Sequence, residues 1–414
     1  MKLLTRSFLV ALLVYLFSFS SLSAQEDSTL FYIDRDWNKI MEIVDTYYYR
    51  SVDHAQCHEQ VLASRNFSSC LDKYSVYLSP LGWAMRQEGL NHNYFGVGMF
   101  IVGRQNRIHI FPIPNLPAAR AGILPNDVLL KIDTLFVTQE QEINRSDLTR
   151  AHNLLRGDSG TTVLLLVKRR EAVLPPIIIR RDRVVIPSVR QAMIAPGIGY
   201  ISIDNFSDHV LSDFMIAFDS LRSEGAEHFI FDLRGNPGGY LNQALRMASL
   251  FADSAGALLV TLRYRLKEDT FRVRVRGVFA GTYPLILTDS NTASAAEIFG
   301  GVLQDWGVAK LVGGHTFGKG IGQLAMPLKR DANGEPAPGS SVMVLTNFHY
   351  LIGNRQTQIN FGVGLRPDYV VNDSLSTEES ALLKRELGSL DPRSLYLNPR
   401  LDASLRRALE ILRQ

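Results

Sequence analysis

Between residues 198 and 312 the chain alternates short apolar runs with amphipathic segments, and this pattern limits the possible folds most strongly. The strand-like run Ile198–Ile203 precedes the helical segment Leu211–Ser223. Two further repeats of strand, loop and helix begin at His228 and Pro284, and Ala309–Val312 adds another strand. This alternation is typical of a layered α/β core with a largely parallel sheet and right-handed crossovers.

Upstream of this core, residues 94–182 have the pattern of a small β-rich module. Strands are predicted, in order, at Gly98–Val102, Ile108–Ile113, Val128–Ile132, Thr162–Lys168 and Pro176–Arg180. Helices are predicted at Ala118–Ala121 and Arg145–Leu155. Gly122 and Gly157 follow these two helices, in the position that glycine favours at helix C-termini.

The N-terminus has the pattern of an export signal. Lys2 and Arg6 form a basic region, Phe8–Phe19 is apolar, and small residues up to Ala24 offer a cleavage site before Gln25. The apolar run is too short to cross a membrane comfortably. We therefore expect a periplasmic or secreted protein with no membrane span in the mature chain; an uncleaved signal anchor is the alternative.

Charge and cysteine content exclude some functions. The length of 414 residues predicts two or three domains, and the net charge of +3 gives no electrostatic reason to expect nucleic acid as a partner. The nine histidines are scattered and metal-ligand spacing is absent, so no metal or cofactor is expected. Cys57 and Cys70 predict a disulfide in an exported chain, with two buried thiols as the alternative.

The clearest chemical signal lies between Asp289 and Gln323. Ser294 stands between a strand-like and a helix-like run, and Lys319 lies in an F-G-K-G loop 25 positions later. A serine nucleophile needs a base, and the nearest histidine, His315, has no evident carboxylate to orient it. A lysine can act as that base if burial lowers its pKa by roughly three units.

Neighbouring residues fit supporting roles in the same chemistry. Gln323 is placed to accept a hydrogen bond from the Lys319 amine, and an uncharged partner would not raise the lysine pKa as a carboxylate would. The N–H of Ala295, at the start of the predicted helix, is one donor for an oxyanion. The second donor is predicted to be Gly238 or Gly239, and the sequence does not choose between them.

Each of these signals also has a simpler interpretation. Ser294 and Glu297 fit the S-x-x-E helix capping box, and an isolated loop lysine is usually solvated. The run from Asp232 to Gly239 could cradle a phosphate, but it lacks both the G-K-[ST] ending and the G-x-G-x-x-G spacing. The order in which the signals occur favours the catalytic interpretation.

That order resembles the C-terminal processing (tail-specific) serine proteases. The matching runs are DLRGNPGG, TASAAE, TFGKG-x-x-Q and GVGLRPD, and the resemblance extends over about residues 36–372. It implies a crotonase-like α/β protease core in which Ser294 is the nucleophile, Lys319 the general base and Gln323 its positioning residue. Two departures are Gly322, where the family usually has a β-branched apolar residue, and the run HYLIGNRQTQ that begins at His349.

The β-rich module resembles a PDZ domain of the bacterial protease type. The resemblance is carried by YFGVGM, IPNLPAARAGILPNDVLLKID and LLRGDSGTTVLLLVKR. It implies a groove in which an extended peptide adds to the sheet edge. Its free carboxylate would meet backbone N–H groups of Phe95, Gly96, Val97 and Gly98. Alternatively, these glycines only allow a strand to begin.

Together these patterns predict an α/β multidomain protein. The expected parts are a signal peptide (1–24), a helical N-terminal region (25–90), a PDZ domain (91–185), a serine protease core (186–372) and a helical tail (373–414). The expected function is endoproteolysis of proteins captured by their free C-termini, and homo-oligomerisation is left open. The alternatives are a catalytically silent secreted peptide-binding scaffold and a crotonase-like enzyme acting on an acyl thioester.

Overall fold

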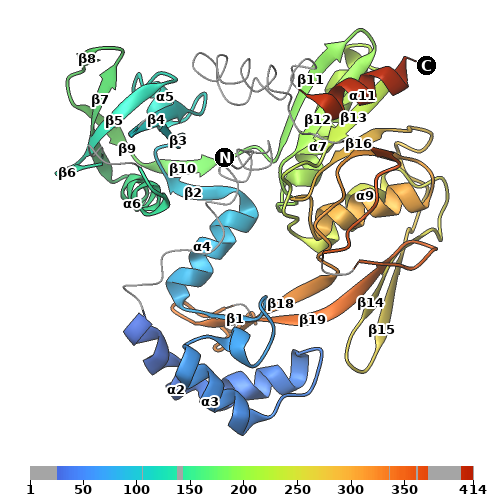
Figure 1. The fold of residues 1–414 in the computed structure, drawn as a ribbon, viewed down its shortest axis with the longest axis horizontal. Helices are drawn as coiled ribbons and strands as arrows, with labels where there is room; N and C mark the ends of the chain where they lie inside the picture. Colours follow the sequence, from blue (N-terminus) through green and yellow to red (C-terminus); the bar gives the residue numbers. More distant parts are fainter. Residues whose placement is uncertain are drawn as a thin grey trace, which may run out of the picture. The chain divides into compact units, whose positions relative to one another are not determined.

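The computed structural model describes residues 26–104, 106–137, 143–334, 336–359, 362–371 and 402–413. The chain forms two compact units (Figure 1), the first built from His92–Pro187 and the second from the described residues on either side of it. The predicted signal peptide and most of the predicted tail lie outside the described residues. Within the described ranges, none of the helices has the length and apolar character needed to cross a membrane.

The first unit is a β-sheet with two helices. Its strands run in the order β3-β4-β5-β7-β8, with β6 beside β5 and β9 beside β7. Their bounds are Met99–Arg104 (β3), Arg107–Pro112 (β4), Asp127–Ile132 (β5), Leu135–Phe136 (β6), Thr162–Arg169 (β7), Ala172–Val173 (β8) and Ile177–Arg180 (β9). The helices are α5 (Pro117–Arg120) and α6 (Arg145–Leu155). The short strands β2 (Asn93–Gly96) and β10 (Asp182–Val185) pair where the chain enters and leaves this unit.

Alternation of side chains explains the core of the first unit. In β7, Val163, Leu165 and Val167 are buried while their neighbours are more exposed, as expected when successive side chains point to opposite faces. They pack with buried residues of the other strands and of α6, such as Leu148 and Ala151. The alternation of apolar and polar residues in the sequence therefore explains which face of this sheet is buried.

The second unit contains a largely parallel sheet in the order β11-β12-β13-β16-β17-β21. Only the pairing of β11 with β12 is antiparallel. The strands are Val189–Ala195 (β11), Ile198–Ile203 (β12), His228–Asp232 (β13), Leu285–Thr288 (β16), Lys310–Gly313 (β17) and Tyr369–Val370 (β21). The helices are α7 (Val210–Ser223), α8 (Leu241–Ser249), α9 (Ala295–Asp305) and α11 (Ala403–Leu412).

Both faces of the parallel sheet are covered, which explains its continuous apolar runs. Ile201 and Phe231 point into the core shared with α7, α8 and α9. The alternate residues Tyr200 and Ile230 point to the other face, where they pack with Leu405 and other residues of α11. The C-terminal helix is thus part of the core, on the face opposite α9 (Figure 1).

The second unit also has an antiparallel sheet that the sequence analysis largely missed. Its order is β1-β19-β14-β15, with β18 and β20 also paired to β19. The strands are Val76–Leu78 (β1), Leu258–Arg263 (β14), Glu268–Arg272 (β15), Ile321–Pro327 (β18), Val342–Ile352 (β19) and Thr357–Gln358 (β20). Of these strands, the sequence predicts only an extended piece ending at Pro80 and a strand at Val342–Phe348, because the alternation of the parallel core dominates the interpretation of this region.

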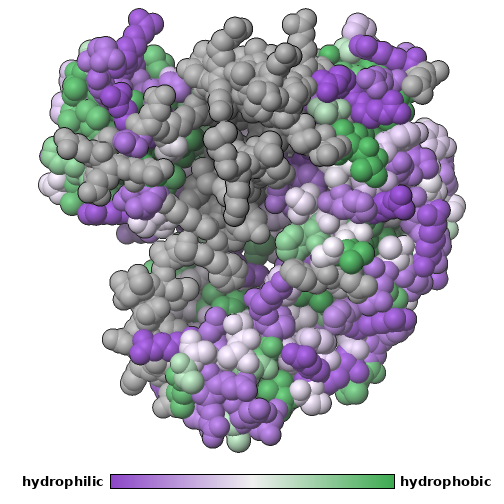
Figure 2. Space-filling view, viewed as in Figure 1, coloured by the Kyte–Doolittle hydropathy of each residue, from purple (hydrophilic) through white to green (hydrophobic). Residues whose placement is uncertain are grey.

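The N-terminal helices α2 (Glu26–Tyr47) and α3 (His54–Ser64) cover this second sheet. Ile40 and Val44 pack against Met343 and Leu345 of β19. Figure 2 shows that the outward face in this region is mainly hydrophilic, with scattered hydrophobic residues. The apolar side of α2 therefore packs the N-terminal segment against the antiparallel sheet.

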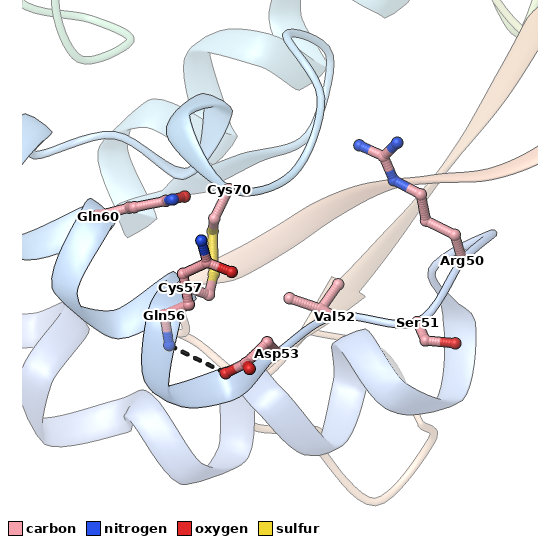
Figure 3. A pocket seen from close by; sticks show the side chains of 8 residues that line it. All are labelled: Arg50, Ser51, Val52, Asp53, Gln56, Cys57, Gln60 and Cys70. Atoms are coloured by element: carbon pink, nitrogen blue, oxygen red, sulfur yellow. Dashed lines mark hydrogen bonds between the residues drawn. A yellow bond between two sulfur atoms is a disulfide. The ribbon is translucent and has the colours of Figure 1, made fainter.

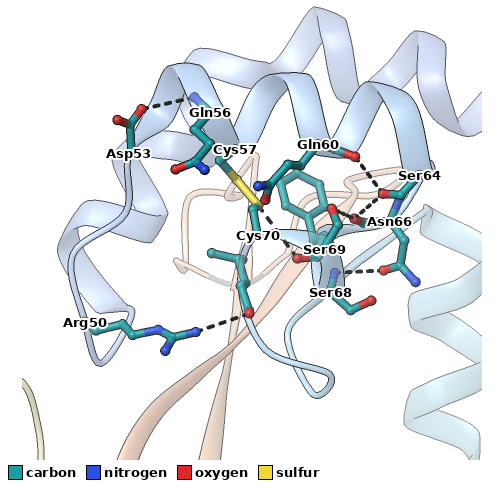
Figure 4. The surroundings of a disulfide bond; sticks show 12 residues. Arg50, Asp53, Gln56, Cys57, Gln60, Ser64, Asn66, Ser68, Ser69 and Cys70 are labelled. Atoms are coloured by element: carbon teal, nitrogen blue, oxygen red, sulfur yellow. Dashed lines mark hydrogen bonds between the residues drawn. A yellow bond between two sulfur atoms is a disulfide. The ribbon is translucent and has the colours of Figure 1, made fainter.

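A disulfide between Cys57 and Cys70 ties α3 to the short turn Phe67–Ser69 (Figure 4). Closing a loop of 13 positions stabilises a fold by about 3 kcal/mol in the chain-entropy model. The bond also lines an open pocket of about 270 Å³ (Figure 3). The charged groups of this pocket have structural partners, because Asp53 caps α3 and Arg50 donates to the Leu71 carbonyl at 3.3 Å.

Candidate active site

Ser294 occupies a sharp turn between β16 and α9. Its backbone angles are φ 57° and ψ −118°, a conformation that residues with a side chain rarely adopt. Between Thr292 and Leu303 it is also the one residue that is not buried. The surrounding fold thus holds a strained serine with partial access to solvent.

Neighbouring groups keep this turn in place. Asp289 Oδ1 accepts hydrogen bonds from the N–H groups of Gly235, Asn291 and Thr292, each at 3.0 Å. The Thr292 hydroxyl donates to the Leu233 carbonyl at 2.8 Å. These bonds attach the serine turn to the glycine-rich loop that follows β13.

Lys319 lies in the loop between β17 and β18, with its side chain partly buried. Its Nζ donates to Gln323 Oε1 at 3.1 Å and lies 5.2 Å from the centre of the Tyr74 ring. The pKa of Lys319 is lowered to about 8, mainly by burial and also by the nearby Arg86 cation, against the opposing effect of Glu297 and Asp72. At pH 7 about one amine in ten is therefore neutral.

Glu297 joins the serine turn to the lysine loop. Its fully buried carboxylate accepts hydrogen bonds at Oε2 from the Ser294 and Lys319 N–H groups, at 2.8 and 2.9 Å. Oε1 accepts from the Gly318 N–H at 2.8 Å and from the Thr316 hydroxyl. The sequence predicted Glu297 only as a helix cap, and its S-x-x-E spacing gave no sign of the three distant donors.

Tyr350 on β19 makes a second connection between these segments. Its hydroxyl is placed to donate to the Lys319 carbonyl and, at 3.4 Å, to the Ser294 carbonyl. The backbones of Ser294 and Lys319 are therefore brought together from both sides. Among the described residues, no hydrogen bond joins Ser294 Oγ directly to Lys319 Nζ, and the amine donates to Gln323 instead.

Gln323 is held in one orientation by groups from the N-terminal region. Its Nε2 donates to the Tyr74 carbonyl, and its Oε1 accepts from Arg86 Nη2 at 3.3 Å as well as from Lys319. The Tyr74 turn is fixed by Asp72, which accepts from the Tyr74 N–H at 2.8 Å. The sequence analysis used this segment only as a resemblance and did not identify Tyr74 or Arg86 as site residues.

The glycine-rich loop lies directly against Ser294. A Cβ on Gly238 would lie 2.8 Å from Ser294 Cβ and 3.0 Å from the Ala295 nitrogen, and Gly238 has a φ of 103°. The Gly238 N–H donates to Asn236 Oδ1 at 2.9 Å. By contrast, the N–H groups of Gly239 and Ala295 have no acceptor among the residues that the structure describes. Of the two glycines, Gly239 therefore has the available donor.

The charged residues of the same loop, Asp232 and Arg234, form ion pairs within the fold. Arg234 donates to both Asp232 and Asp402, with distances of 2.6 to 3.1 Å. Tyr200 donates to Asp232 Oδ2 at 2.7 Å, and both aspartates are buried. This network ties the loop to Asp402, which also caps α11. The loop thus offers no free guanidinium for a phosphate.

Gly322 departs from the family pattern for a steric reason. A Cβ at this position would lie 2.0 Å from the Phe348 ring, so a β-branched side chain would collide with it. Phe348 lies on β19, opposite Gly322. Glycine therefore fits at this position because the facing strand carries a large side chain there.

The four predicted peptide-binding residues lie in the first unit, in β2 and in the two positions between β2 and the edge strand β3. Phe95 is exposed and, with Gly96, belongs to β2. The Val97 and Gly98 carbonyls accept from Ala118 and Ile113, while their N–H groups have no acceptor among the described residues. Beyond them, β3 pairs with β4 alone within the described part of the sheet, and this leaves one edge of β3 unpaired.

The chain is similar to known proteins over most of its length. The model of peptidase family S41 matches residues 197–371. The carboxy-terminal processing protease CtpA of Bacillus subtilis is 32% identical over 291 residues, which cover 70% of this chain and 60% of that protein. A carboxy-terminal-processing protease of Bartonella bacilliformis is 29% identical over 344 residues, 81% of this chain and 74% of that protein. The chain thus spans three fifths of the length of the Bacillus relative.

One solved structure has the same fold. It is a Bacteroides fragilis protein assigned to the S41 proteases, with a TM-score of 0.53 and 18% identity. The match covers 85% of this chain and 97% of that one. At this identity the likeness supports the mixed α/β fold alone. Within the described residues, no group of three or more histidine, cysteine or acidic residues could hold a metal ion.

Proposed function

We propose that the chain is a serine endopeptidase of the carboxy-terminal processing type within peptidase family S41, the family whose model matches residues 197–371. The proposal assigns Ser294 as nucleophile and Lys319 as general base. One observation carries it: a single buried carboxylate, Glu297, binds the backbone N–H groups of a strained serine and of a lysine with a depressed pKa. A simple capping role for Glu297 gives no reason for the lysine loop to be held there.

In the proposed reaction, the neutral Lys319 amine takes the proton of the Ser294 hydroxyl as Oγ attacks the peptide carbonyl. The N–H groups of Ala295 and Gly239 donate to the oxyanion that forms. Lys319 then returns the proton to the leaving amine, and the C–N bond breaks. Water then attacks the acyl-enzyme, and Lys319 takes a proton from it. Lys319 returns this proton to Ser294 Oγ as the ester bond breaks, which releases the new C-terminus and the free serine.

Gln323 is proposed to position the lysine amine. A neutral amine that donates one N–H to Gln323 Oε1 keeps its lone pair available for the serine hydroxyl. Gln323 carries no charge, so it orients the amine without stabilising the ammonium form. This leaves burial as the main cause of the low lysine pKa.

We propose further that the first unit is a PDZ domain that captures substrate C-termini. The N–H groups of Val97 and Gly98, which have no acceptor among the described residues, suit a carboxylate. The edge of β3 that no described strand pairs with suits an added peptide strand. The names of the relatives, carboxy-terminal processing proteases, favour substrates of this kind. Export to the periplasm or the cell exterior is proposed from the pattern of residues 1–24.

A peptide-binding scaffold without catalysis is the second candidate. It is favoured by one observation, the absence among the described residues of a Ser294–Lys319 side-chain hydrogen bond. Under the protease proposal, the same observation corresponds to a resting site that tightens when substrate binds.

The test uses the chain from residue 25 onward with casein and with a peptide that has a free or an amidated C-terminus. We expect cleavage by the wild type and none by Ser294→Ala or Lys319→Ala, while both variants still bind the free-carboxylate peptide. The exposed residues Ser290 and Lys329 provide matched controls, and their alanine variants should cleave normally. Wild-type cleavage by Ser294→Ala would reject the nucleophile, whereas binding without cleavage by the wild type would favour the scaffold.

A further inference from the structure

We propose that Arg86 is a positioning residue for Lys319: it fixes the Gln323 amide and keeps a permanent positive charge beside the lysine amine. Arg86 lies on α4 (Pro80–Asn91), far in sequence from both partners. The inference rests on the proposed function in one respect, since it takes Lys319 to be the base. It adds a residue that the family motifs do not include.

The hydrogen bonds of Gln323 carry the geometric part of the proposal. Its Oε1 accepts from Lys319 Nζ at 3.1 Å and from Arg86 Nη2 at 3.3 Å, while its Nε2 donates to the Tyr74 carbonyl. If the amide were flipped, its NH₂ group would face two donors and its oxygen would face a carbonyl. Arg86 therefore favours the one orientation in which Gln323 accepts from the lysine.

Arg86 brings a charge that no carboxylate of the described chain neutralises. It makes no ion pair with a described residue, and burial lowers its own pKa without removing its charge. Because Arg86 and Lys319 donate to the same oxygen, at 3.3 and 3.1 Å, their nitrogens are at most 6.4 Å apart. Two positive charges at this separation repel each other in a partly buried site, and the lysine is the one that can lose its charge.

Other charged and titratable groups around Lys319 act in the opposite direction or are neutral. Glu297 from α9 and Asp72 from the turn before β1 both favour the ammonium form. Tyr74 from that turn and Tyr350 from β19 also face the lysine loop, and burial raises the pKa of Tyr350 and favours its neutral form. Among these neighbours, Arg86 is the one cation that opposes protonation of the amine.

The helix that carries Arg86 is fixed at both ends. At its start, the Trp83 N–H donates to the Ser79 carbonyl at 2.8 Å. At its end, the Leu90 carbonyl accepts from Asn205 Nδ2 at 3.2 Å, and the Asn91 side chain accepts from the Tyr240 hydroxyl at 2.9 Å. α4 also packs on β1 (Figure 1). The guanidinium is thus presented by an anchored element.

The test measures protonation of Lys319 directly, without relying on proteolysis. Competitive acetylation with trace acetic anhydride between pH 6 and 11, read by mass spectrometry of the peptide containing Lys319, gives the midpoint at which its amine becomes reactive. We expect the midpoint to rise by about one to two pH units in Arg86→Met, because one positive charge at this distance is lost. In Arg86→Lys the Lys319 midpoint should stay close to its wild-type value, since this variant retains the positive charge.

Arg263→Met is the matched control. Arg263 is exposed and paired with Glu268, so the Lys319 midpoint should not move. If proteolysis is observed, the acidic limb of kcat/KM should shift with the labelling midpoint. Arg86→Gln serves as a second neutral variant if Arg86→Met does not fold.

An unchanged labelling midpoint in a folded neutral variant would overturn the proposal, whatever happens to the rate. A raised midpoint without any proteolysis would support the role of Arg86 and count against the protease function. The two ideas can therefore fail separately.

Discussion

Replacing Glu297 with glutamine is the sharpest test of how this site is assembled. The carboxylate accepts four hydrogen bonds, from the Ser294, Gly318 and Lys319 N–H groups and from the Thr316 hydroxyl. Glutamine has nearly the same size but one oxygen and one NH₂ group. At least one buried N–H therefore loses its acceptor, and the remaining bonds lose their charge assistance.

The expected loss of stability follows from these bonds. A buried donor left without an acceptor costs about 1–3 kcal/mol, and a hydrogen bond to a charged group contributes about twice as much as a neutral one. Glu297→Gln should therefore lower the free energy of unfolding by about 3 to 5 kcal/mol, a large part of the 5–15 kcal/mol typical of a domain. Relaxation of the serine turn should reduce kcat/KM by about 100-fold.

The same substitution should also shift the pH dependence of kcat/KM in one direction. The charge of Glu297 raises the pKa of Lys319, against the larger lowering effect of burial. Without that charge, the lysine pKa should fall below about 8, so the acidic limb of kcat/KM should move to lower pH even as the maximal rate drops. A variant that only loosens the fold would lower the rate without moving the limb.

Urea denaturation followed by tryptophan fluorescence measures the stability change in the right unit, because Trp37, Trp83 and Trp306 all lie in the second unit. Asp53→Asn is a matched carboxylate-to-amide control, since Asp53 is exposed and caps α3 without contacting the site. It should cost less than about 1 kcal/mol. If Glu297→Gln costs no more than this control and keeps the wild-type pH profile, the idea that Glu297 joins the two catalytic segments is wrong.

Three further predictions concern the base, the glycine loop and the C-terminal helix. Because the base must be neutral, kcat/KM should rise about tenfold per pH unit below the Lys319 pKa of about 8 and level off above it; a flat profile from pH 6 to 9.5 on a fluorogenic peptide would exclude this base. Gly238→Ala should reduce kcat/KM by more than about 100-fold, since its Cβ would collide with Ser294 and its φ of 103° suits glycine; near-normal turnover would contradict the close packing. Asp402→Ala should destabilise the second unit by about 3 kcal/mol, because it leaves the buried Arg234 with one carboxylate; an unchanged urea midpoint would show that α11 does not stabilise this loop.

The strands and helices of the first unit and of the parallel core could be predicted because their sequence patterns are local. The predicted strand Ile198–Ile203 coincides with β12, and the predicted helix Arg145–Leu155 coincides with α6. The antiparallel sheet was largely missed for the opposite reason. Val76 of β1 lies opposite Val344 of β19, and no local pattern specifies that pairing.

Residue chemistry, together with an order of motifs that resembles the C-terminal processing proteases, directed attention to Ser294 and Lys319. The second oxyanion donor could not be chosen from the sequence, since Gly238 and Gly239 are equivalent until one N–H is seen to bond Asn236. The same limit applied to Glu297, whose spacing from Ser294 fits an ordinary helix cap.

The sequence by itself indicated most strands and helices of the parallel core and of the first unit, and it indicated which residues are candidates for the proposed acyl transfer, because both depend on side-chain type and short-range spacing. Only the tertiary structure decided which groups surround the lysine amine. Gln323 binds Tyr74, 249 positions away, and Arg86, 237 positions away. Such neighbours are set by the packing of the N-terminal region against β19, and the charge and burial that tune a pKa arise only when distant parts of the chain meet.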